Sequence, residues 1–382
     1  MKTVNFLTYY FIPENTAATN RVLAMVKELE KRYKVNVICA TEKGKAQKDK
    51  STMMQYSENI NIYYINQKEY DGEKFYTRAL YELGYAYLIA KKSNKIKSDV
   101  KITTAPSMFL IPVVALMVRG KKVIDIRDLV WDYMSSNSLF SKVLKQQIQA
   151  LMKFSIKSYD YISVTNDHEI EWIKNKVKKD EIVKITNGIE DENFLELSSI
   201  SLNKTDKFTI TYVGNIGIAQ NIETLIDAAK ELKNVKINLV GEGSRYKFLK
   251  SYTKKNQISN VEFFGKVPRD KMIDFYNKSS ILYAQLDEKF KAAMPSKLYE
   301  YASTGLPIIY GGVGEARKFV QNLDNCRAID PCNVKQLIDA IKSFEDKDLK
   351  ISEKNRDFIK DNFIRETQSE KLVDVVDSLV NK

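Results

Sequence analysis

One short segment places two lysines and a carboxylate around a predicted helix start. It reads Lys291-Ala292-Ala293-Met294-Pro295-Ser296-Lys297-Leu298-Tyr299-Glu300-Tyr301. Pro295 and Ser296 are typical of the first positions of a helix, whose amino end favours an anion. The Glu300 carboxylate, one turn further on, can accept hydrogen bonds from a pair of hydroxyl groups. The segment therefore predicts recognition of a phosphorylated ligand with a diol; the alternative is an ordinary capped helix with solvated charges.

Three glycine-rich turns follow predicted strands in the second half of the chain. They are Gly214–Gly217, Gly241–Gly243 and Gly311–Gly314. Glycine lets the backbone approach a ligand closely, and the amino end of a following helix can bind phosphate. The first turn has neither the spacing of a Walker loop nor that of a dinucleotide fingerprint. One such turn is equally typical of a plain tight turn, but three at one rim favour a phosphorylated ligand.

The composition favours an anionic partner and excludes several kinds of site. The 382 residues include 61 Lys and Arg against 49 Asp and Glu, a net charge of +12. Such an excess attracts phosphorylated small molecules, anionic lipid or nucleic acid. Three cysteines without zinc-finger spacing fit buried thiols in a reducing compartment, and the single histidine excludes a His-rich metal site. That histidine, His168, follows Thr165-Asn166-Asp167, which favours a helix-capping region over a catalytic base.

The sequence predicts a cytoplasmic protein that is soluble or rests on the inner face of a membrane. The longest apolar run, Met108–Val118, is too short to cross a hydrocarbon layer of ~30 Å. The first residues read as a strand without the pattern of a signal peptide. Two predicted helices, Phe75–Lys97 and Leu139–Ser158, are rich in lysine, and the second should face the core with Leu144, Ile148, Leu151 and Phe154. A solvated basic face is the ordinary explanation, and contact with an anionic leaflet is the alternative.

Alternating strands and helices must position these residues. The strands expected in the first half are Thr3–Thr8, Lys34–Thr41, Ile60–Asn66, Val100–Thr104, Lys121–Ile126, Tyr159–Thr165 and Ile182–Thr186. Those expected in the second half are Phe208–Val213, Val235–Val240, Val261–Phe264, Ile281–Gln285, Pro307–Tyr310 and Arg327–Ile329. This pattern predicts an α/β protein with two parallel sheets covered on both faces, and ligands beyond the carboxyl ends of the strands.

We expect two domains and a polar linker between them. The first domain should span residues 1–195 and the second residues 205–360, with the stretch 191–207 as the linker. The tail from about Ser352 should be helical with a break near Asn362. The sequence alone does not show which domain its last part, residues 361–382, covers. We expect this part to pack on the first domain.

The segment around Lys297 resembles the donor-site helix of the retaining glycosyltransferases of family 4, which have the GT-B fold. Further pieces lie in that family's order, over nearly the whole chain: Tyr10–Glu14, Asp125–Asp128, Asn187–Ile189, Val213–Gly217, Gly241–Gly243 and Gly265–Val267. The chain is most similar to the bacterial branch that adds N-acetylated amino sugars in O-antigen or capsule assembly. The resemblance implies two doubly wound Rossmann-like domains facing across a cleft. It also implies retaining, metal-independent transfer from a UDP-linked sugar to a lipid-linked acceptor of the undecaprenyl diphosphate type, without a cofactor.

The resemblance implies a role for each matching position. Glu300 would hold the ribose, backbone near Gly265–Val267 would face the base, and backbone N–H groups of Gly214–Gly217 would help lysines to neutralise the diphosphate. The implied catalytic residues are Asp128, Lys291 and Lys297. The implied donor-binding residues are Gly214, Asn215, Gly217, Gly243, Arg245, Lys266, Val267, Pro295, Ser296, Leu298 and Glu300. On the side of the acceptor and sugar they are Glu14, Asn15, Arg127 and Trp131, although Trp131 is equally typical of a core edge.

Two positions depart from the family's pattern, and two other functions stay open. Ala292 stands where the family commonly has a first Glu, and the glycine loop has Ile218 and Gln220 in place of its usual basic residues, for which Lys291 is the candidate replacement. The Asp-x-Asp at Asp346 is expected to be solvated surface. A nucleotide-sugar 2-epimerase would need more proton-transfer groups than one histidine supplies. A nucleic-acid-binding protein would need basic and aromatic residues in one exposed stripe.

Overall fold

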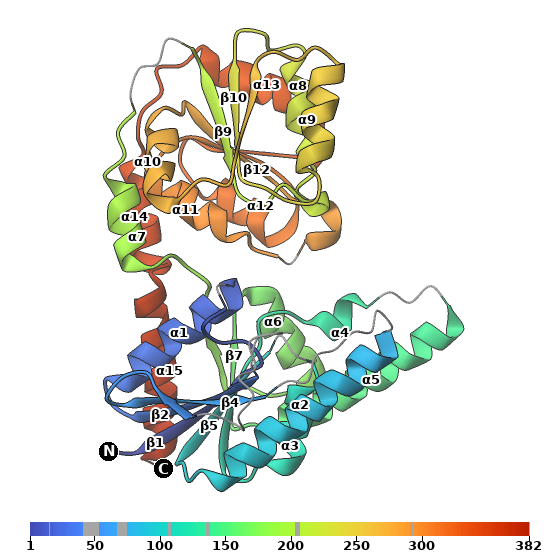
Figure 1. Ribbon diagram of the computed structural model, residues 1–382, viewed down its shortest axis with the longest axis vertical. Helices are drawn as coiled ribbons and strands as arrows, with labels where there is room; N and C mark the ends of the chain where they lie inside the picture. Colours follow the sequence, from blue (N-terminus) through green and yellow to red (C-terminus); the bar gives the residue numbers. More distant parts are fainter. Residues whose placement is uncertain are drawn as a thin grey trace. The chain divides into compact units, whose positions relative to one another are not determined.

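The computed structural model describes residues 1–14, 16–40, 53–66, 75–105, 108–134, 138–202, 207–291 and 293–381. The chain divides into two units: unit 1 comprises Met1–Asn187 with Arg365–Lys382, and unit 2 comprises Gly188–Ile364. Each unit has a parallel or mainly parallel sheet with helices on both faces, so the predicted α/β class is confirmed (Figure 1). The expected linker is wrong in its first part, because Asp191–Ser198 forms helix α7.

The sheet of unit 1 has the strand order β3-β4-β2-β1-β5-β6-β7-β8. Its strands are β1 (Thr3–Leu7), β2 (Lys34–Ala40), β3 (Met53–Gln55), β4 (Ile60–Ile65), β5 (Val100–Thr104), β6 (Lys121–Asp125), β7 (Tyr161–Val164) and β8 (Ile182–Lys184). Val4 of the central strand pairs in parallel with Val35 and with Val100. Only β3 runs antiparallel among the described strands of this sheet, and the sequence did not predict it, because its three residues are exposed and carry no apolar alternation.

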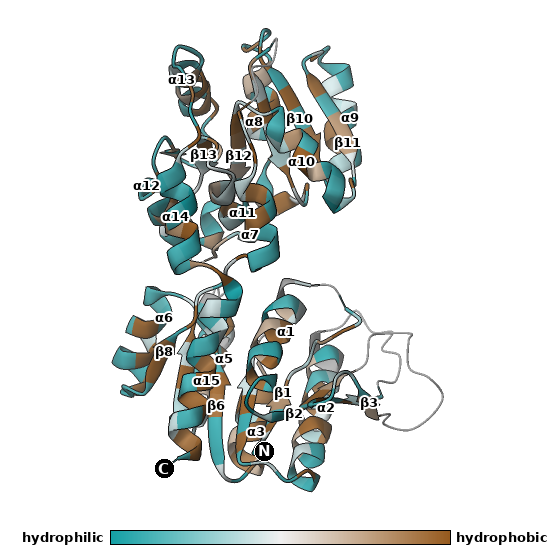
Figure 2. Ribbon diagram, turned by 90° about the vertical axis from the view of Figure 1, so that its left-hand side faces the viewer, coloured by the Kyte–Doolittle hydropathy of each residue, from teal (hydrophilic) through white to brown (hydrophobic). Residues whose placement is uncertain are grey.

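Helices cover both faces of this sheet. They are α1 (Ala17–Glu30), α2 (Phe75–Lys95), α3 (Leu110–Met117), α4 (Val130–Tyr133), α5 (Leu139–Lys157), α6 (Asp167–Trp172) and α15 (Arg365–Val380). Neighbouring strand residues point to opposite faces, so Phe6 packs with α1 and α15 whereas Leu7 packs with α2, α3 and α5. Apolar and polar residues alternate along α1 and α15 as this arrangement requires (Figure 2). The tail breaks near Asn362 as predicted, and α15 packs against α1. Asp377 of α15 accepts hydrogen bonds from Arg32 and Tyr33, just beyond the end of α1.

The sheet of unit 2 is entirely parallel in its described strands, with the order β11-β10-β9-β12-β13-β14. The strands are β9 (Thr209–Val213), β10 (Lys236–Val240), β11 (Val261–Gly265), β12 (Ile281–Gln285), β13 (Ile308–Gly311) and β14 (Arg327–Ile329). The helices, besides α7, are α8 (Glu223–Ala229), α9 (Tyr246–Lys255), α10 (Arg269–Asn277), α11 (Ser296–Thr304), α12 (Gly314–Gln321), α13 (Val334–Glu345) and α14 (Glu353–Asn362). Ile281 and Tyr283 face the core under α8 and α13, whereas Leu282 and Ala284 face the core under α11 and α12.

Helix α11 has the limits that the sequence predicts. Pro295 is its amino-terminal cap and Ser296 its first residue. It ends at Gly305, whose φ of 73° lies in the left-handed region where glycine carries no steric penalty. Helices α7 and α14 pack against α11, which holds it against the sheet.

Candidate functional site

The centre of the site in unit 2 is the ammonium of Lys297. Its Nζ donates a hydrogen bond to the hydroxyl of Tyr212 at 2.6 Å and lies 3.8 Å from the centre of the same ring. A Cβ at Gly214 would stand only 2.6 Å from this nitrogen, so glycine at 214 leaves the room that the ammonium needs. Burial lowers the pKa of Lys297 to about 7, and the Glu300 carboxylate opposes part of that shift. The lysine is thus held beside the glycine loop as the sequence predicts.

Helix α11 is fixed in register on the end of β9. The hydroxyl of Tyr301 accepts a hydrogen bond from the backbone N–H of Val213 at 2.8 Å and donates to its carbonyl at 3.2 Å. Lys297 and Tyr301 are four residues apart, so both lie on one face of the helix. Glu300 lies on this part of the helix near Lys297 and near the buried hydroxyl of Tyr276, whose pKa is raised well above its usual value by burial and by the Glu300 charge. A cation and a carboxylate therefore stand on one turn beside the glycine loop.

The glycine turns after β9, β10 and β11 pack backbone against backbone. Gly214 N donates to Val240 O at 2.9 Å, Ile216 N donates to Glu242 O at 2.8 Å, and Gly241 N donates to Gly265 O at 2.7 Å. Gly241 and Gly243 have φ of 131° and 157°, and a Cβ on either would collide with the carbonyls of Gly214 and Ile216. These contacts bring two of the three predicted turns together at the carboxyl edge of the sheet.

Three of the four backbone N–H groups in the glycine loop have partners within the protein. Backbone N–H groups of 214–217 were expected to bind a diphosphate. Those of Gly214 and Ile216 already donate within the protein, and that of Gly217 donates to the Gln220 side chain at 3.2 Å. Gln220, which replaces a basic residue of the family's pattern, therefore closes the loop. The nearest fixed positive charge is the Lys297 ammonium.

The other residues expected on the donor side have diverse surroundings. Leu298 is fully buried in the core, so its side chain is not available to a ligand. The guanidinium of Arg245 pairs with Glu223 and stands 4.0 Å above the ring of Phe248. Val267 packs partly into the core. The remaining ones, Asn215, Lys266, Pro295 and Ser296, line the turns and the start of α11 with partly or fully exposed side chains.

Lys291 lies before α11, but it is anchored by its backbone. Its carbonyl accepts a hydrogen bond from Glu315 N at 3.1 Å, at the start of α12. Gly314 has a φ of 69°, and a Cβ there would collide with that carbonyl. The Lys291 side chain is exposed, so its proposed role toward a diphosphate stays a prediction. Ala292, where the family has a first Glu, lies outside the described residues.

In unit 1, a buried ion pair organises the carboxyl edge of the sheet. Arg21 of α1 binds both carboxylate oxygens of Asp125, at 2.7 and 3.2 Å, and both side chains are almost fully buried. The charge and the hydrogen bonds of Arg21 hold the pKa of Asp125 below its usual value in spite of burial, and Thr104 and Ser163 also donate to this carboxylate. The guanidinium also donates to the carbonyl of Ile185 at 2.9 Å. The pair therefore ties three strands, α1 and the end of β8 together.

Asp128, Arg127 and Glu169 form a charged group next to this ion pair. Burial raises the pKa of Asp128 although its side chain reaches the surface, and Arg127 opposes the shift. Burial raises the pKa of Glu169 to about 8, while hydrogen bonds from Thr165 counteract it and the Asp128 charge adds to it. Because like charges repel, Asp128 and Glu169 favour retention of a proton at this edge. The Nε of Arg127 is buried and has no partner among the described residues.

Trp131 belongs to the core, which corrects its assignment to the acceptor side. It is 1% exposed and contacts Trp172 edge to face, with the ring centres 5.8 Å apart. Glu14 is half-buried near Tyr10 and Cys39, and Asn15 lies outside the described residues. His168 lies in the first turn of α6, whose amino-terminal cap is Asn166, so the expected position in a capping region is confirmed.

Sequence reasoning missed two residues of these sites. Tyr212 was read only as a strand residue, because the side chain it would meet lies 85 positions away. Glu169 did carry a local signal, because it stands three residues after the cap Asn166, the sequence spacing of a capping box. Its carboxylate accepts a hydrogen bond from Thr165 N, before the cap, at 2.6 Å.

The described part of the chain has neither a cluster of metal ligands nor a membrane-spanning helix. There, no group of three or more His, Cys, Asp and Glu side chains could hold a metal ion. Asp346 and Asp348 are exposed at and beyond the end of α13, as predicted for solvated surface. Within the same residues, no helix is both long and apolar enough to span a membrane.

Comparison with known proteins identifies the second unit. Residues 193–364 match the family described as Glycosyl transferases group 1. The matched residues cover most of unit 2 and less than half of the whole chain. These residues contain the glycine turns, α11 and both of its charged residues, so the family match and the geometry concern the same part of the chain.

Relatives of known sequence or structure agree with this assignment. The chain is 24% identical over 295 residues to the probable glycosyltransferase WbjE of Pseudomonas aeruginosa, covering 69% of this chain and 72% of that protein. It is 28% identical over 141 residues to an uncharacterized glycosyltransferase of Methanocaldococcus jannaschii, but that match spans only 35% of this chain and 38% of the archaeal protein. None of the proteins named here is an epimerase or a nucleic-acid-binding protein.

Solved structures establish the fold. Sucrose-phosphate synthase from Thermosynechococcus elongatus superposes with a TM-score of 0.75 at 13% identity, covering 99% of both chains. The Anabaena protein HepE, solved with UDP and glucose, superposes with a TM-score of 0.66 at 12% identity, covering 99% of this chain and 100% of that one. The predicted GT-B fold is confirmed. Its glycosyltransferase group 1 domain and its relatives together support a glycosyltransferase.

Proposed function

We propose that the protein transfers a sugar from a nucleoside diphosphate donor, with unit 2 as the donor-binding unit. The observation that carries this proposal is the placement of Lys297 and Glu300 on one turn of α11, with the ammonium seated against Gly214 and Tyr212. The two groups match the two ends of a nucleoside diphosphate that need recognition. A cation suits the diphosphate, and a carboxylate suits the two hydroxyls of a ribose.

Lys297 would stabilise the leaving group. Cleavage of the bond between sugar and phosphate develops negative charge on the diphosphate, and a preorganised cation lowers the energy of that charge. The pKa of Lys297, lowered to about 7 by burial, should rise again when a diphosphate binds beside it. Because a lysine can neutralise the charge in this way, the reaction is proposed to need no metal.

The donor base is proposed to be uracil. HepE was solved with UDP, and a trehalose-6-phosphate-related enzyme of E. coli, with a TM-score of 0.73, was solved with UDP-2-fluoro glucose. The backbone at Gly265–Val267, after β11, is the proposed contact for the base. An N-acetylated amino sugar, retention of configuration and a lipid-linked acceptor in surface polysaccharide assembly rest on the family resemblance. Asp128 in unit 1 is proposed to face the transferred sugar and the acceptor.

The surface of α2, α3 and α5 supports a membrane-bound acceptor. These three helices cover one face of the sheet of unit 1, and each exposes large apolar side chains. Leu139 is 81% and Phe154 69% exposed on α5, and Leu151 is exposed as well, so the expected core-facing role of Leu151 and Phe154 is wrong. Exposed lysines such as Lys142 and Lys157 accompany them. Apolar side chains among cations fit an anionic leaflet, where each lysine contributes about 1 kcal/mol.

Product analysis tests the proposed reaction. The purified chain is incubated with UDP-N-acetylglucosamine in excess EDTA, with and without a lipid-linked acceptor, and UDP and sugar products are separated. We expect UDP release, faster with acceptor, and a sugar with unchanged configuration at C2. A sugar inverted at C2 would show an epimerase instead. Activity that vanishes in EDTA and returns with magnesium would contradict the metal-independent step alone.

A matched pair of variants tests the site. Glu300→Gln should abolish most of the UDP release, because the amide replaces a charged acceptor for the ribose hydroxyls. Glu231→Gln, which changes an exposed carboxylate in the same unit, should leave the rate unchanged. Equal rates for both variants would remove Glu300 from the site.

A further inference from the structure

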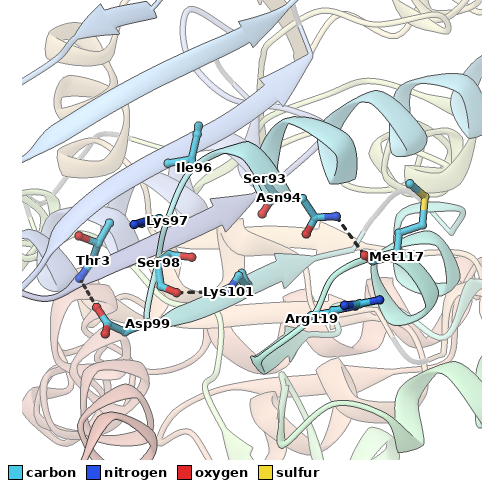
Figure 3. A pocket seen from close by; sticks show the side chains of 10 residues that line it. All are labelled: Thr3, Ser93, Asn94, Ile96, Lys97, Ser98, Asp99, Lys101, Met117 and Arg119. Carbon is cyan, nitrogen blue, oxygen red and sulfur yellow. Dashed lines mark hydrogen bonds between the residues drawn. The ribbon is translucent and has the colours of Figure 1, made fainter.

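Unit 1 contains a polar cavity at the amino-terminal ends of its strands. The candidate residues Arg127 and Asp128 lie at the opposite, carboxyl-terminal ends. The cavity has a volume of about 790 Å³ (Figure 3). Its walls come from the end of α2, the segment that leads into β5, the starts of β1 and β5, the end of α3, and Arg119 between α3 and β6. These segments precede the strands, whereas Arg127 and Asp128 follow β6. The cavity is therefore separate from the site discussed above.

Positive charge dominates the walls of this cavity. Lys97, Lys101 and Arg119 line it, against the single carboxylate of Asp99. That carboxylate is engaged by the backbone N–H of Thr3 at 2.8 Å. Among the described residues, no carboxylate forms a salt bridge with any of the three cations. The balance leaves a surplus of two positive charges for an incoming anion.

One of the cations is held inside the wall. Lys101 Nζ donates to the carbonyl of Ser98 at 3.2 Å, and a Cβ at Gly120, where φ is 91°, would lie 3.2 Å from the same nitrogen. Burial lowers the pKa of Lys101, and the neighbouring Lys122 lowers it further while Asp99 opposes both. An anion in the cavity would offset this cost of holding a buried charge.

Two hydroxyl groups in the cavity wall lack partners. Ser93 is completely buried, and its Oγ has no hydrogen-bond partner among the described residues; the same is true of the buried Oγ of Ser98. Buried hydroxyls are nearly always bonded, so these two are spare hydrogen-bond donors within the wall of one cationic cavity. The wall itself is rigidly braced, because Asn94 Nδ2 donates to Met117 O at 3.0 Å and joins α2 to α3.

We propose that this cavity binds a phosphate group of a small phosphorylated molecule, at a site independent of the sugar donor. A phosphate carries the two charges that the surplus requires, accepts hydrogen bonds from serine hydroxyls and is bound well by an arginine fork. The volume lies within the range of small-molecule sites and exceeds the needs of inorganic phosphate alone. Ile96 and Met117 give the cavity an apolar side for the rest of the molecule. The phosphate can belong to a soluble ester or to the headgroup of a lipid.

Calorimetry with glucose 1-phosphate and inorganic diphosphate tests the proposal for soluble compounds. The lining double variant Lys97→Gln/Arg119→Gln should weaken binding at least tenfold. Ser93→Ala should weaken it by a smaller factor. The matched control Lys91→Gln/Lys95→Gln removes two charges from the neighbouring turns of α2 that do not line the cavity, and it should bind as the wild type does. Lys297→Met, in unit 2, should also retain this binding.

Sedimentation with vesicles that contain phosphatidic acid tests the lipid source. A lipid headgroup is supported as the source if two results are found. The protein must bind these vesicles more strongly than phosphatidylglycerol vesicles, and only the lining double variant must lose this binding. The proposal is overturned if neither soluble probe nor phosphatidic acid binds. It is equally overturned if the lining variant binds as well as the wild type, or if Lys297→Met alone abolishes binding, since the probe would then occupy the donor site.

Discussion

At the level of single residues, the proposed donor site depends most on Lys297. Its ammonium is buried against an aromatic ring and a glycine, where water cannot fully solvate it. A charge in such surroundings is unstable unless an anion joins it. The same residue can therefore recognise a diphosphate in the ground state and stabilise the charge that develops on it as the sugar leaves.

This arrangement predicts that donor binding weakens as the pH rises. The pKa of Lys297 is about 7 in the free protein, so the ammonium is already charged at pH 6 and must take up a proton on binding above pH 7. The affinity for a UDP-sugar, whose diphosphate diester keeps its charge, should be constant below pH 7 and fall by up to tenfold per pH unit above it. Fluorescence or calorimetric titrations between pH 6 and 9 measure this slope.

The lysine variant separates this effect from other titrating groups. Lys297→Met should bind the UDP-sugar weakly and with no slope over the same range, whereas the exposed Lys335→Met should behave as the wild type. A wild-type affinity that stays level from pH 6 to 9 would mean that Lys297 does not meet the diphosphate.

For the proposed donor site, the sequence indicated the charged residues of α11 but not the groups that surround them. Lys297 and Glu300 were indicated by the sequence because the residues that start and end the helix lie close to both charges in the chain. Tyr212 could not, because its contact with Lys297 joins positions far apart in the chain. The internal bonding of the glycine loop was also hidden, since it depends on Gln220 folding back onto Gly217. Trp131 was ambiguous because an aromatic residue after a strand suits a core edge and a ligand equally.

At the scale of elements, the ion pair of Arg21 and Asp125 links α1 to β6 and to the chain leaving β8. A buried charge left without its partner is strongly destabilising. We expect Arg21→Leu to lower the free energy of unfolding of unit 1 by about 3–5 kcal/mol. Urea denaturation followed by circular dichroism measures the loss.

The matched control is Arg32, which lies just beyond the end of α1. Arg32 pairs with Asp377 of α15 at the surface, and its side chain is 59% exposed. Arg32→Leu should cost about 1 kcal/mol or less, because solvent screens an exposed pair. If both variants lose equal stability, the buried pair does not organise this edge of the sheet.

The strands could be predicted almost throughout because each is a short apolar run between polar turns. β5, β12 and β14 have the predicted limits, and the other expected strands differ by one to three residues in total. The three residues of β3 gave no signal, as their side chains are exposed. Helix α7 was missed because it is short and lies in a polar stretch, although Phe194 and Leu197 are buried in the core of unit 2. Pairing with β4 forms β3, and burial in the core of unit 2 stabilises α7.

At the level of the whole molecule, the net charge of +12 and the exposed apolar residues of α2, α3 and α5 both favour binding to an anionic membrane surface. The protein should sediment with phosphatidylglycerol vesicles at low salt. Binding should decrease as salt rises, because surface charges are screened beyond about 8 Å at physiological ionic strength. Vesicles of neutral phosphatidylcholine should bind much less.

Charge reversal on α5 tests which surface is responsible. Lys142→Glu/Lys157→Glu should weaken vesicle binding more than tenfold, since each lysine contributes about 1 kcal/mol and each glutamate adds repulsion. Lys27→Glu/Lys34→Glu makes the same change in net charge with one lysine on α1 and one at the start of β2, and should have a small effect. Equal losses for both pairs would show that net charge alone, and not this surface, controls the binding.

UDP calorimetry on the full chain tests whether α11 of unit 2 binds a uridine diphosphate through Lys297 and Glu300. The wild type should bind UDP in EDTA and prefer it to GDP and ADP. Glu300→Gln should bind UDP about 10- to 150-fold more weakly, corresponding to the loss of roughly 1.5–3 kcal/mol from one charge-assisted hydrogen bond, with the fold retained by circular dichroism. Wild-type affinity for UDP in Glu300→Gln, or the absence of UDP binding by the wild type, would contradict the account.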